Sequence, residues 1–236
     1  MGDEEACDEA LLPPFHDFNY GEDGWRYSSE NYLHLKGRSQ LLVDNLLDLT
    51  HLPYVHHHLG GGEAMANPKM HEEDSESFYR VVRTGKVPWN PFHELVFGKE
   101  AQFEGLSDFK IISDFYGPEL IRTGLPVTTA VPGHDEVPPE LGSMWIMHAI
   151  TPETETTTHY FGFSIRNFRL ESEELDEFQR RSDIEIRQQD KDAIDAVEER
   201  LESAAARQRE LLVKADGPAV KVRRIVEQML VAEQEA

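Results

Sequence analysis

The pattern of hydrophobic and polar positions divides the chain into a strand-rich first two thirds and a helical last third. Leu33 and Leu35 alternate with polar neighbours, which predicts a short strand over residues 31–36. Further β-like segments, separated by turn formers, lie at 78–83, 109–116, 120–131, 143–151 and 157–168. Strands that follow one another without intervening helices form antiparallel sheets, so we expect an α+β fold.

Three helical segments are expected around this sheet. Residues 39–52 have apolar side chains around most of the helical wheel, which predicts a buried helix with Ser39 as its N-cap and Pro53 as its limit. Residues 172–212 are rich in Glu, Gln, Arg and Ala and predict one long helix, and residues 218–233 predict a second.

Two stretches show neither the period of a helix nor the two-residue alternation of a strand. The glycines, proline and acidic residues at 57–77 predict a long loop. Residues 1–30 mix acids with prolines and glycine, which predicts an irregular N-terminal arm. The expected organisation is therefore an arm over residues 1–30 followed by one domain over residues 31–236.

Charge and cysteine content narrow the class of protein. The 236 residues carry 23 basic and 45 acidic side chains, a net charge of −22, and the basic residues are scattered. Phosphate and anionic lipid repel such a chain, so neither nucleic acid nor a membrane is an expected partner. No apolar run reaches the ~18 residues of a membrane span and the N-terminus is acidic, so we expect a cytoplasmic protein. The single cysteine, Cys7, excludes an intrachain disulfide.

Three polar residues interrupt the apolar helix expected over 39–52. Asn45, Asp48 and His51 recur every third residue and so share one helix face. A polar stripe that faces water is one explanation of this spacing. His56 follows His51 by five residues, across Pro53. Two imidazoles at this separation can meet around one ion, which makes both histidines candidate metal ligands.

The long helix contains a carboxylate where its apolar periodicity predicts a hydrophobic residue. Ile186, Ile194, Val197 and Leu201 define an apolar stripe, and Asp190 takes the missing position in that series. Buried carboxylates are protonated, paired with a cation or bound to a metal. A surface acid on a broader polar face is the alternative.

Together His51, His56 and Asp190 supply two imidazoles and one carboxylate. Such a set binds one face of non-haem iron(II) and leaves three coordination positions open. Asp48 would lie next to these ligands, where it can hydrogen-bond an imidazole and fix its tautomer. A zinc hydrolase can use the same ligands, but the sequence has no H-E-x-x-H motif to supply a general base.

Two segments resemble the catalytic domain of Rieske non-haem iron oxygenases, in particular the vanillate O-demethylase and dicamba monooxygenase group. They are VDNLLDLTHLPYVH at 43–56 and TPETETTTHYFGFSIRNF at 151–168. The resemblance implies a helix-grip fold, in which an antiparallel sheet wraps around a long C-terminal helix. It also implies a monooxygenase that uses O2 to hydroxylate a methyl ether or related group of an aromatic small molecule, releasing formaldehyde when the ether collapses.

The resemblance implies a role for each candidate around the metal. His51, His56 and Asp190 resemble the iron ligands. Asn45 resembles a residue lining the iron site, and Asp48 resembles the acid that bridges the iron site to a neighbouring subunit's Rieske cluster.

Two further positions concern the substrate. His148 resembles a substrate-contacting histidine, although a histidine on a sheet face explains it equally well. Arg181 stands where the dicamba enzyme presents an aromatic residue, so that enzyme's substrate does not transfer to this chain.

The sequence departs from the family because it lacks the ligands of a Rieske cluster. The family's N-terminal domain holds a [2Fe-2S] centre with two cysteines and two histidines, and this sequence has Cys7 alone. The opening MGDEEACDEALLPPF resembles the family's connection between domains, so Met1 is expected to be an internal methionine. A [2Fe-2S] cluster is then expected only from upstream sequence or another chain, with a reductase or ferredoxin as electron donor and a homotrimer as assembly.

Two functions remain open at this point. The first is an iron(II) oxygenase catalytic domain, and the second is a redox-inactive helix-grip module that binds a small molecule. A pure binding module has no reason to keep a carboxylate on a buried stripe, so an intact set of ligands favours the oxygenase.

Overall fold

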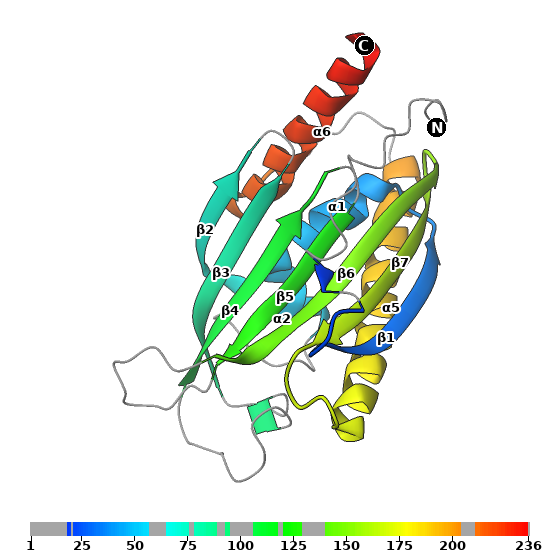
Figure 1. Ribbon diagram of the computed structural model, residues 1–236. Coiled ribbons are helices and arrows are strands. Elements are labelled where there is room, and N and C mark those ends of the chain that lie inside the picture. Colours follow the sequence, from blue (N-terminus) through cyan, green and yellow to red (C-terminus); the bar gives the residue numbers. More distant parts are fainter. Residues whose placement is uncertain are drawn as a thin grey trace.

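The structure is a computed structural model that describes residues 18–19, 21–56, 65–75, 78–88, 93–94, 106–117, 120–128, 140–203 and 211–235. Within these residues one antiparallel sheet of seven strands forms a single layer (Figure 1). The strands are β1 (Arg26–Leu35), β2 (Lys69–Asp74), β3 (Tyr79–Pro88), β4 (Leu106–Phe115), β5 (Leu120–Thr128), β6 (Glu140–Thr154) and β7 (Thr157–Arg166). Their order across the sheet is β1-β7-β6-β5-β4-β3-β2.

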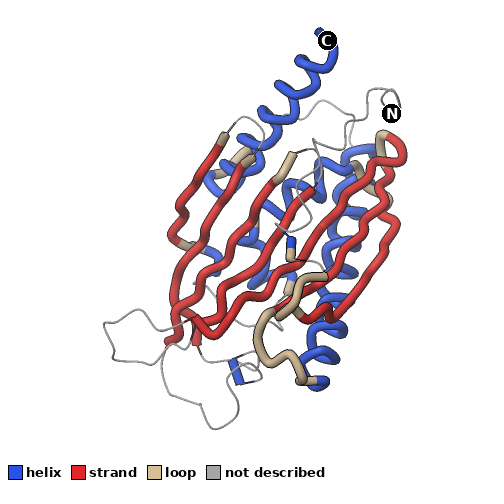
Figure 2. Tube along the Cα trace, viewed as in Figure 1, coloured by secondary structure: helices blue, strands red, loops and turns tan. Residues whose placement is uncertain are grey.

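The helices lie behind the sheet in the view of Figure 2, and the last of them extends past the upper end of the sheet. They are α1 (Ser39–Leu47), α2 (Leu52–Val55), α5 (Glu173–Ser203) and α6 (Gly217–Glu235), with 3₁₀ turns η4 (Leu49–His51) and η7 (Lys214–Asp216). The long helix α5 runs along β1, and α1 contacts both α5 and α6. This arrangement confirms the predicted α+β, helix-grip-like fold. No helix in the described ranges is long and apolar enough to cross a membrane.

The hydrophobic core fills the space between the sheet and helices α1, α5 and α6. Its buried members come from the sheet and from all three of these helices: Leu35, Leu42, Val43, Leu46, Leu47, Tyr79, Val81, Phe115, Ile121, Ile150, Tyr160, Ile194, Val222 and Ile225. Burying one such large apolar side chain contributes about 1.5–3 kcal/mol. Helix α1 supplies four of these residues, so the core holds α1 firmly against the sheet.

The C-terminal end of α1 is also fixed by polar contacts from the sheet. The last carbonyls of a helix have no partner within the helix. Ser113 of β4 donates to the carbonyl of Leu46 over 3.1 Å, and the buried Arg83 of β3 donates to the carbonyl of Leu47. Burial lowers the pKa of Arg83 to about 10. These bonds determine where the chain leaves α1.

The predicted helix over 39–52 is interrupted. Helix α1 ends at Leu47, Asp48 has extended backbone angles, and its carboxylate caps η4 by accepting from the backbone N–H of Thr50 over 2.9 Å. Pro53 lies in the first turn of α2, where a missing N–H costs nothing, rather than ending a helix. The predicted Ser39 cap is wrong by one residue.

Arg38 takes the N-cap position of α1 instead. Its backbone N–H and its guanidinium both donate to Glu198 of α5, with Nη2–Oε1 at 2.5 Å. A long-range contact therefore replaces the local side-chain cap.

Two other boundaries differ from expectation. Strand β1 begins at Arg26, so residues 26–30 belong to the sheet rather than to an irregular arm. Within the predicted loop over 57–77, residues 69–74 form the edge strand β2, which pairs with β3. Residues 57–64, 76 and 77 lie outside the described residues. Tertiary pairing with β3 overrides the loop-like composition of β2.

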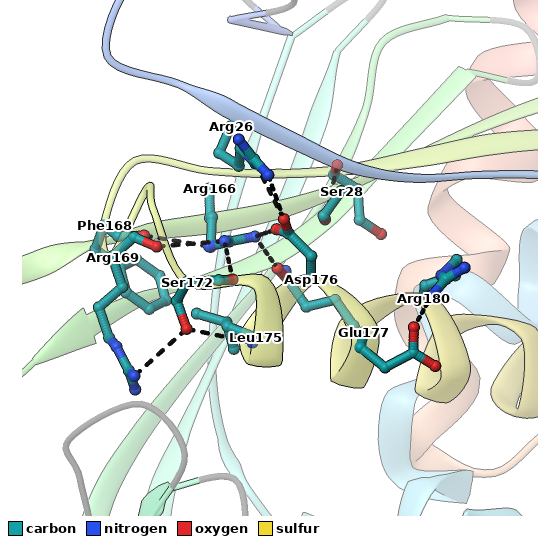
Figure 3. A network of polar contacts seen from close by, with 12 residues as sticks. Arg26, Ser28, Arg166, Phe168, Arg169, Ser172, Leu175, Asp176, Glu177 and Arg180 are labelled. Carbon is teal, nitrogen blue, oxygen red and sulfur yellow. Dashed lines mark hydrogen bonds and ion pairs between the residues drawn. The ribbon is translucent and has the colours of Figure 1, made fainter.

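The N-terminal end of α5 is anchored by a buried arginine of β7 (Figure 3). Arg166 donates to Gln179 Oε1 over 2.6 Å and pairs with Asp176 over 2.5 Å. Arg26 of β1 contacts the same Asp176, and Ser172 Oγ accepts from the N–H of Leu175. The start of α5 is thereby joined to the two strands at one side of the sheet.

The contact between Arg83 and the end of α1 yields a stability prediction. Arg83→Met removes the donor to the Leu47 carbonyl, and an unsatisfied buried group costs about 1–3 kcal/mol. We expect urea denaturation to show a loss of that size. Lys86→Met on the same strand is the control, because Lys86 is exposed and its ion pair with Asp108 contributes at most about 1 kcal/mol. Equal losses in both variants would contradict the assignment.

Candidate metal centre

Three predicted ligands meet where η4 and α2 face the middle of α5. His51 ends η4, His56 directly follows α2, and Asp190 lies on α5. One ligand atom from each residue lies within 4.8 Å of the others. Oδ1 of Asp190 is 3.5 Å from Nε2 of His51 and 3.1 Å from Nε2 of His56. His56 is fully buried, as Asp190 nearly is, whereas the His51 side chain is 19% exposed.

The other nitrogen of each ring is held by the protein. Nδ1 of His51 donates to the backbone carbonyl of Asp48 over 2.6 Å. Nδ1 of His56 donates to Oε1 of Gln189 over 2.7 Å. These two acceptors select the Nδ1–H tautomer, so each neutral ring presents its lone pair at Nε2.

This donor set fits a metal cation. Two Nε2 lone pairs face a carboxylate oxygen, and three acceptors cannot satisfy one another without a proton or a cation between them. Two imidazoles and one carboxylate on one side match the ligands of mononuclear non-haem iron(II), with coordination positions left open. The contacts with the two histidines also change the pKa of Asp190. Burial raises the pKa of Asp190, but hydrogen bonds and charge attraction from His51 and His56, when their Nε2 atoms carry a proton, outweigh it and hold that pKa well below its usual range.

Asn45 and Asp48 lie beside these three residues. Nδ2 of Asn45 donates to Oδ1 of Asp190 over 3.1 Å. Asp48 contacts a candidate ligand through its backbone carbonyl, because its carboxylate is engaged with Thr50. The imidazole of His51 therefore donates to the backbone carbonyl of Asp48 and not to its carboxylate, which is the group that the sequence indicated. The interruption of the helix at Asp48 separates the predicted polar stripe into two elements.

His148 lies on the inner face of β6 and is buried. Its Nδ1 is 2.5 Å from the hydroxyl of Tyr160, and its Nε2 is 2.8 Å from Oγ1 of Thr123. Burial and the nearby Arg187 lower the pKa of His148 well below its ordinary value, so the ring is neutral. Arg181 is exposed on α5.

The buried face of α5 differs from the predicted apolar stripe. Asp190 and Ile194 are buried as expected, but Val197 and Leu201 are 46% and 39% exposed. The buried residues recur every three or four positions and are mainly polar: Leu175, Gln179, Asp183, Arg187, Asp190, Ile194 and Glu198. Hydrophobicity alone could not identify this face. For the same reason, the sequence pattern did not identify Gln189, Asp183 or Arg187. The helical spacing of Asp183 and Arg187 from Asp190 was the one signal that could have found these two.

Comparison with known proteins identifies the family. Residues 35–232 match the model of the vanillate O-demethylase oxygenase C-terminal domain. The chain belongs to this family. It is thus a Rieske oxygenase catalytic domain related to O-demethylases, as the resemblance implied. Its curated relatives include oxygenase components named as vanillate and dicamba O-demethylases, and one solved structure of dicamba monooxygenase contains non-haem iron and dicamba.

The chain matches individual relatives over different shares of their length. A putative toluene-4-sulfonate monooxygenase iron–sulfur subunit of Comamonas testosteroni is 37% identical over 161 residues, which are 66% of this chain and 46% of that protein. A vanillate O-demethylase oxygenase subunit of Pseudomonas sp. is 30% identical over 100% of this chain and 66% of its own length. The chain therefore spans about half to two thirds of these relatives.

A solved structure agrees with the fold. The crystal structure of dicamba monooxygenase bound to 3,6-dichlorosalicylic acid superposes with a TM-score of 0.84 at 23% identity. The match covers 100% of this chain and 67% of that one.

The acceptor of the His56 N–H provides a test of the metal centre in this vanillate O-demethylase relative. Gln189→Leu removes the Oε1 that holds Nδ1 of His56, and loss of such partners lowers metal affinity about 10–100-fold. We expect that loss in anaerobic Fe(II) titrations. Gln188→Leu is the matched control, since the neighbouring Gln188 is exposed and bonds Asp192. Equal affinities in the two variants would show that Gln189 does not orient a ligand.

Proposed function

We propose that this chain is the iron(II)-binding catalytic domain of a Rieske-type monooxygenase that hydroxylates or O-demethylates an aromatic small molecule with O2. The observation that carries the proposal is the convergence of the Nε2 atoms of His51 and His56 on the buried Asp190 carboxylate. Membership of the vanillate O-demethylase family supports the same chemistry. Bound iron would supply the activation of dioxygen, which no side chain here can perform.

The chain's own residues have holding and orienting roles in this proposal. His51, His56 and Asp190 would bind one face of the ion. Asp48 and Gln189 keep the imidazole lone pairs directed at the site, and Asn45 holds the carboxylate. Rings held in this way do not have to be ordered when the metal binds, so little affinity is lost to side-chain entropy.

His148 is the proposed substrate contact. Both its ring nitrogens are engaged, with Thr123 and Tyr160. Contact with a polar group of the substrate through a ring nitrogen thus requires one of these hydrogen bonds to be exchanged. Because the ring is neutral, it would donate at one nitrogen and accept at the other.

Electrons have to come from outside these 236 residues. Inserting one oxygen atom from O2 consumes two electrons, and a Rieske cluster needs two cysteines where this sequence has Cys7 alone. We propose that a [2Fe-2S] cluster from upstream sequence or another chain delivers them, fed by a reductase or ferredoxin. Asp48 would face the cluster of a neighbouring subunit in a homotrimer.

Hydrogen peroxide tests the chemistry without a cluster, because it supplies both the oxygen atom and the two electrons. An aryl methyl ether and H2O2 would give the phenol, formaldehyde and water. We expect the Fe(II)-loaded chain to release formaldehyde with vanillate, 3-methoxybenzoate or 4-methoxybenzoate as probes, vanillate being chosen because a relative is named a vanillate O-demethylase.

The H51A/H56A variant should release none. An Fe(II)-loaded chain that binds these ethers without forming formaldehyde would instead favour the redox-inactive binding module.

Metal stoichiometry and stability give a second test of the same site. We expect about one Fe(II) per chain and none in H51A/H56A, because two of the three ligands are gone. A ligand at 100 times its Kd stabilises the folded state by about 2.7 kcal/mol, which raises Tm by roughly 5–10 °C in a domain of this size. Calorimetry with and without a chelator measures this difference. Stoichiometric iron in H51A/H56A would place the metal elsewhere.

A further inference from the structure

Arg187 lies on α5 three residues before Asp190 and is 2% exposed. Residues three apart share a helix face, and both side chains lie on the buried face of α5. Nε of Arg187 donates to Oδ1 of Asp183 over 2.9 Å, and Nη2 donates to the carbonyl of Met147 over 3.3 Å. The Nη1 atom is buried without a hydrogen-bond partner among the described residues. Hydrogen bonds therefore restrain only part of this guanidinium.

A glycine of β7 provides the remaining restraint. Gly162 pairs with Asn31 of β1 on one side and with His148 of β6 on the other. A Cβ added at Gly162 would lie 2.2–2.5 Å from Nη1, Nη2 and Cζ of Arg187, closer than real Cβ contacts. The guanidinium thus rests directly on the backbone of β7. The ring of Tyr160, whose centroid is 4.6 Å from Cζ, flanks it on the same strand.

Asp183 holds this guanidinium from the other side. Its Oδ2 accepts from Nδ2 of Asn31 over 2.5 Å while its Oδ1 accepts from Arg187. One buried pair on α5 therefore contacts β1, β6 and β7. These contacts fix the distance between helix and sheet and the rotation of the helix about its axis.

We propose that Arg187, seated on Gly162, is a positioning residue that sets the height of α5 over the sheet and thereby places the Asp190 carboxylate opposite His51 and His56. The proposal rests on the proposed metal site. The hydrogen bonds and ion pair of Arg187 among the described residues go to Asp183 and Met147 and not to His51, His56 or Asp190, although its charge attracts the Asp190 carboxylate. A side chain at position 162 would lift the guanidinium and carry Asp190, one turn further along the helix, away from the histidines.

A cycle of four proteins tests the coupling between the two residues: wild type, G162A, D183N/R187M and G162A/D183N/R187M. Replacing Asp183 together with Arg187 avoids an uncompensated buried charge. The probe is cobalt(II), whose visible absorption reports coordination geometry and whose affinity is measured by titration. G162A should lower cobalt affinity at least about tenfold and change the spectrum, as loss of an outer-shell partner does.

In the D183N/R187M background, which should itself bind more weakly, adding G162A should change affinity by less than about twofold, because no guanidinium is displaced. A loss of the same size in both backgrounds would overturn the proposal. Gly85→Ala is the matched control. Its added Cβ would meet the Phe109 ring at 2.6 Å, on β3 away from α5, and should leave cobalt affinity unchanged.

Crystal structures of wild type and G162A without metal separate this proposal from the metal site itself. We expect the contact between His56 Nε2 and Asp190 Oδ1, 3.1 Å in the wild type, to lengthen in G162A. If wild type bound no cobalt, the proposed function would fail, and this distance would still decide the role of Arg187. An unmoved Asp190 beside a shifted guanidinium would refute the positioning role.

Discussion

A buried carboxylate surrounded by other hydrogen-bond acceptors is the constraint on which the rest of this domain depends. Removing a carboxylate from water costs several kcal/mol unless a cation or several donors compensate. Among the described residues, the side chains bonded to Asp190 are Asn45, His51 and His56. Only Asn45 is a permanent donor. The imidazoles compensate for the burial of this carboxylate only when a proton or a metal ion lies between them and it. The folded chain therefore favours the binding of a cation at this position.

This requirement explains why the contacts of α5 are polar and directional. Apolar side chains allow a helix to slide or rotate slightly, whereas hydrogen bonds have a narrow range of length and angle. Along α5 the chain uses Gln179 with Arg166, Asp183 with Asn31 and Glu198 with Arg38. The helix is therefore fixed at its start, its middle and near its end. A metal site needs this precision, because ligand distances vary by only about 0.2 Å.

The sequence predicted the parts of this structure that follow from local pattern, and it missed those that depend on distant partners. The order of the strands other than β2, and the presence of a buried helix before them and of two helices after them, followed from period and turn residues. The spacing of Asp48, His51 and His56 together with the position of Asp190 brought out the candidate ligands. The break at Asp48 was missed because Arg83 and Ser113 determine the end of α1 from the sheet. The buried face of α5 was missed because its polar residues resemble a solvated face until their partners are known.

Exposure around the site indicates the side from which small molecules can reach it. His56 is fully buried and the Asp190 side chain is 6% exposed, while the His51 side chain is 19% exposed. The chain that carries His51 is anchored through the end of α1, and Asp190 is anchored through α5. Two separately fixed elements thus meet at the centre, with the solvent-accessible side at η4. Ligand spacing then depends on how α1 and α5 sit on one sheet, which makes the sheet itself the reference for the geometry of the metal centre.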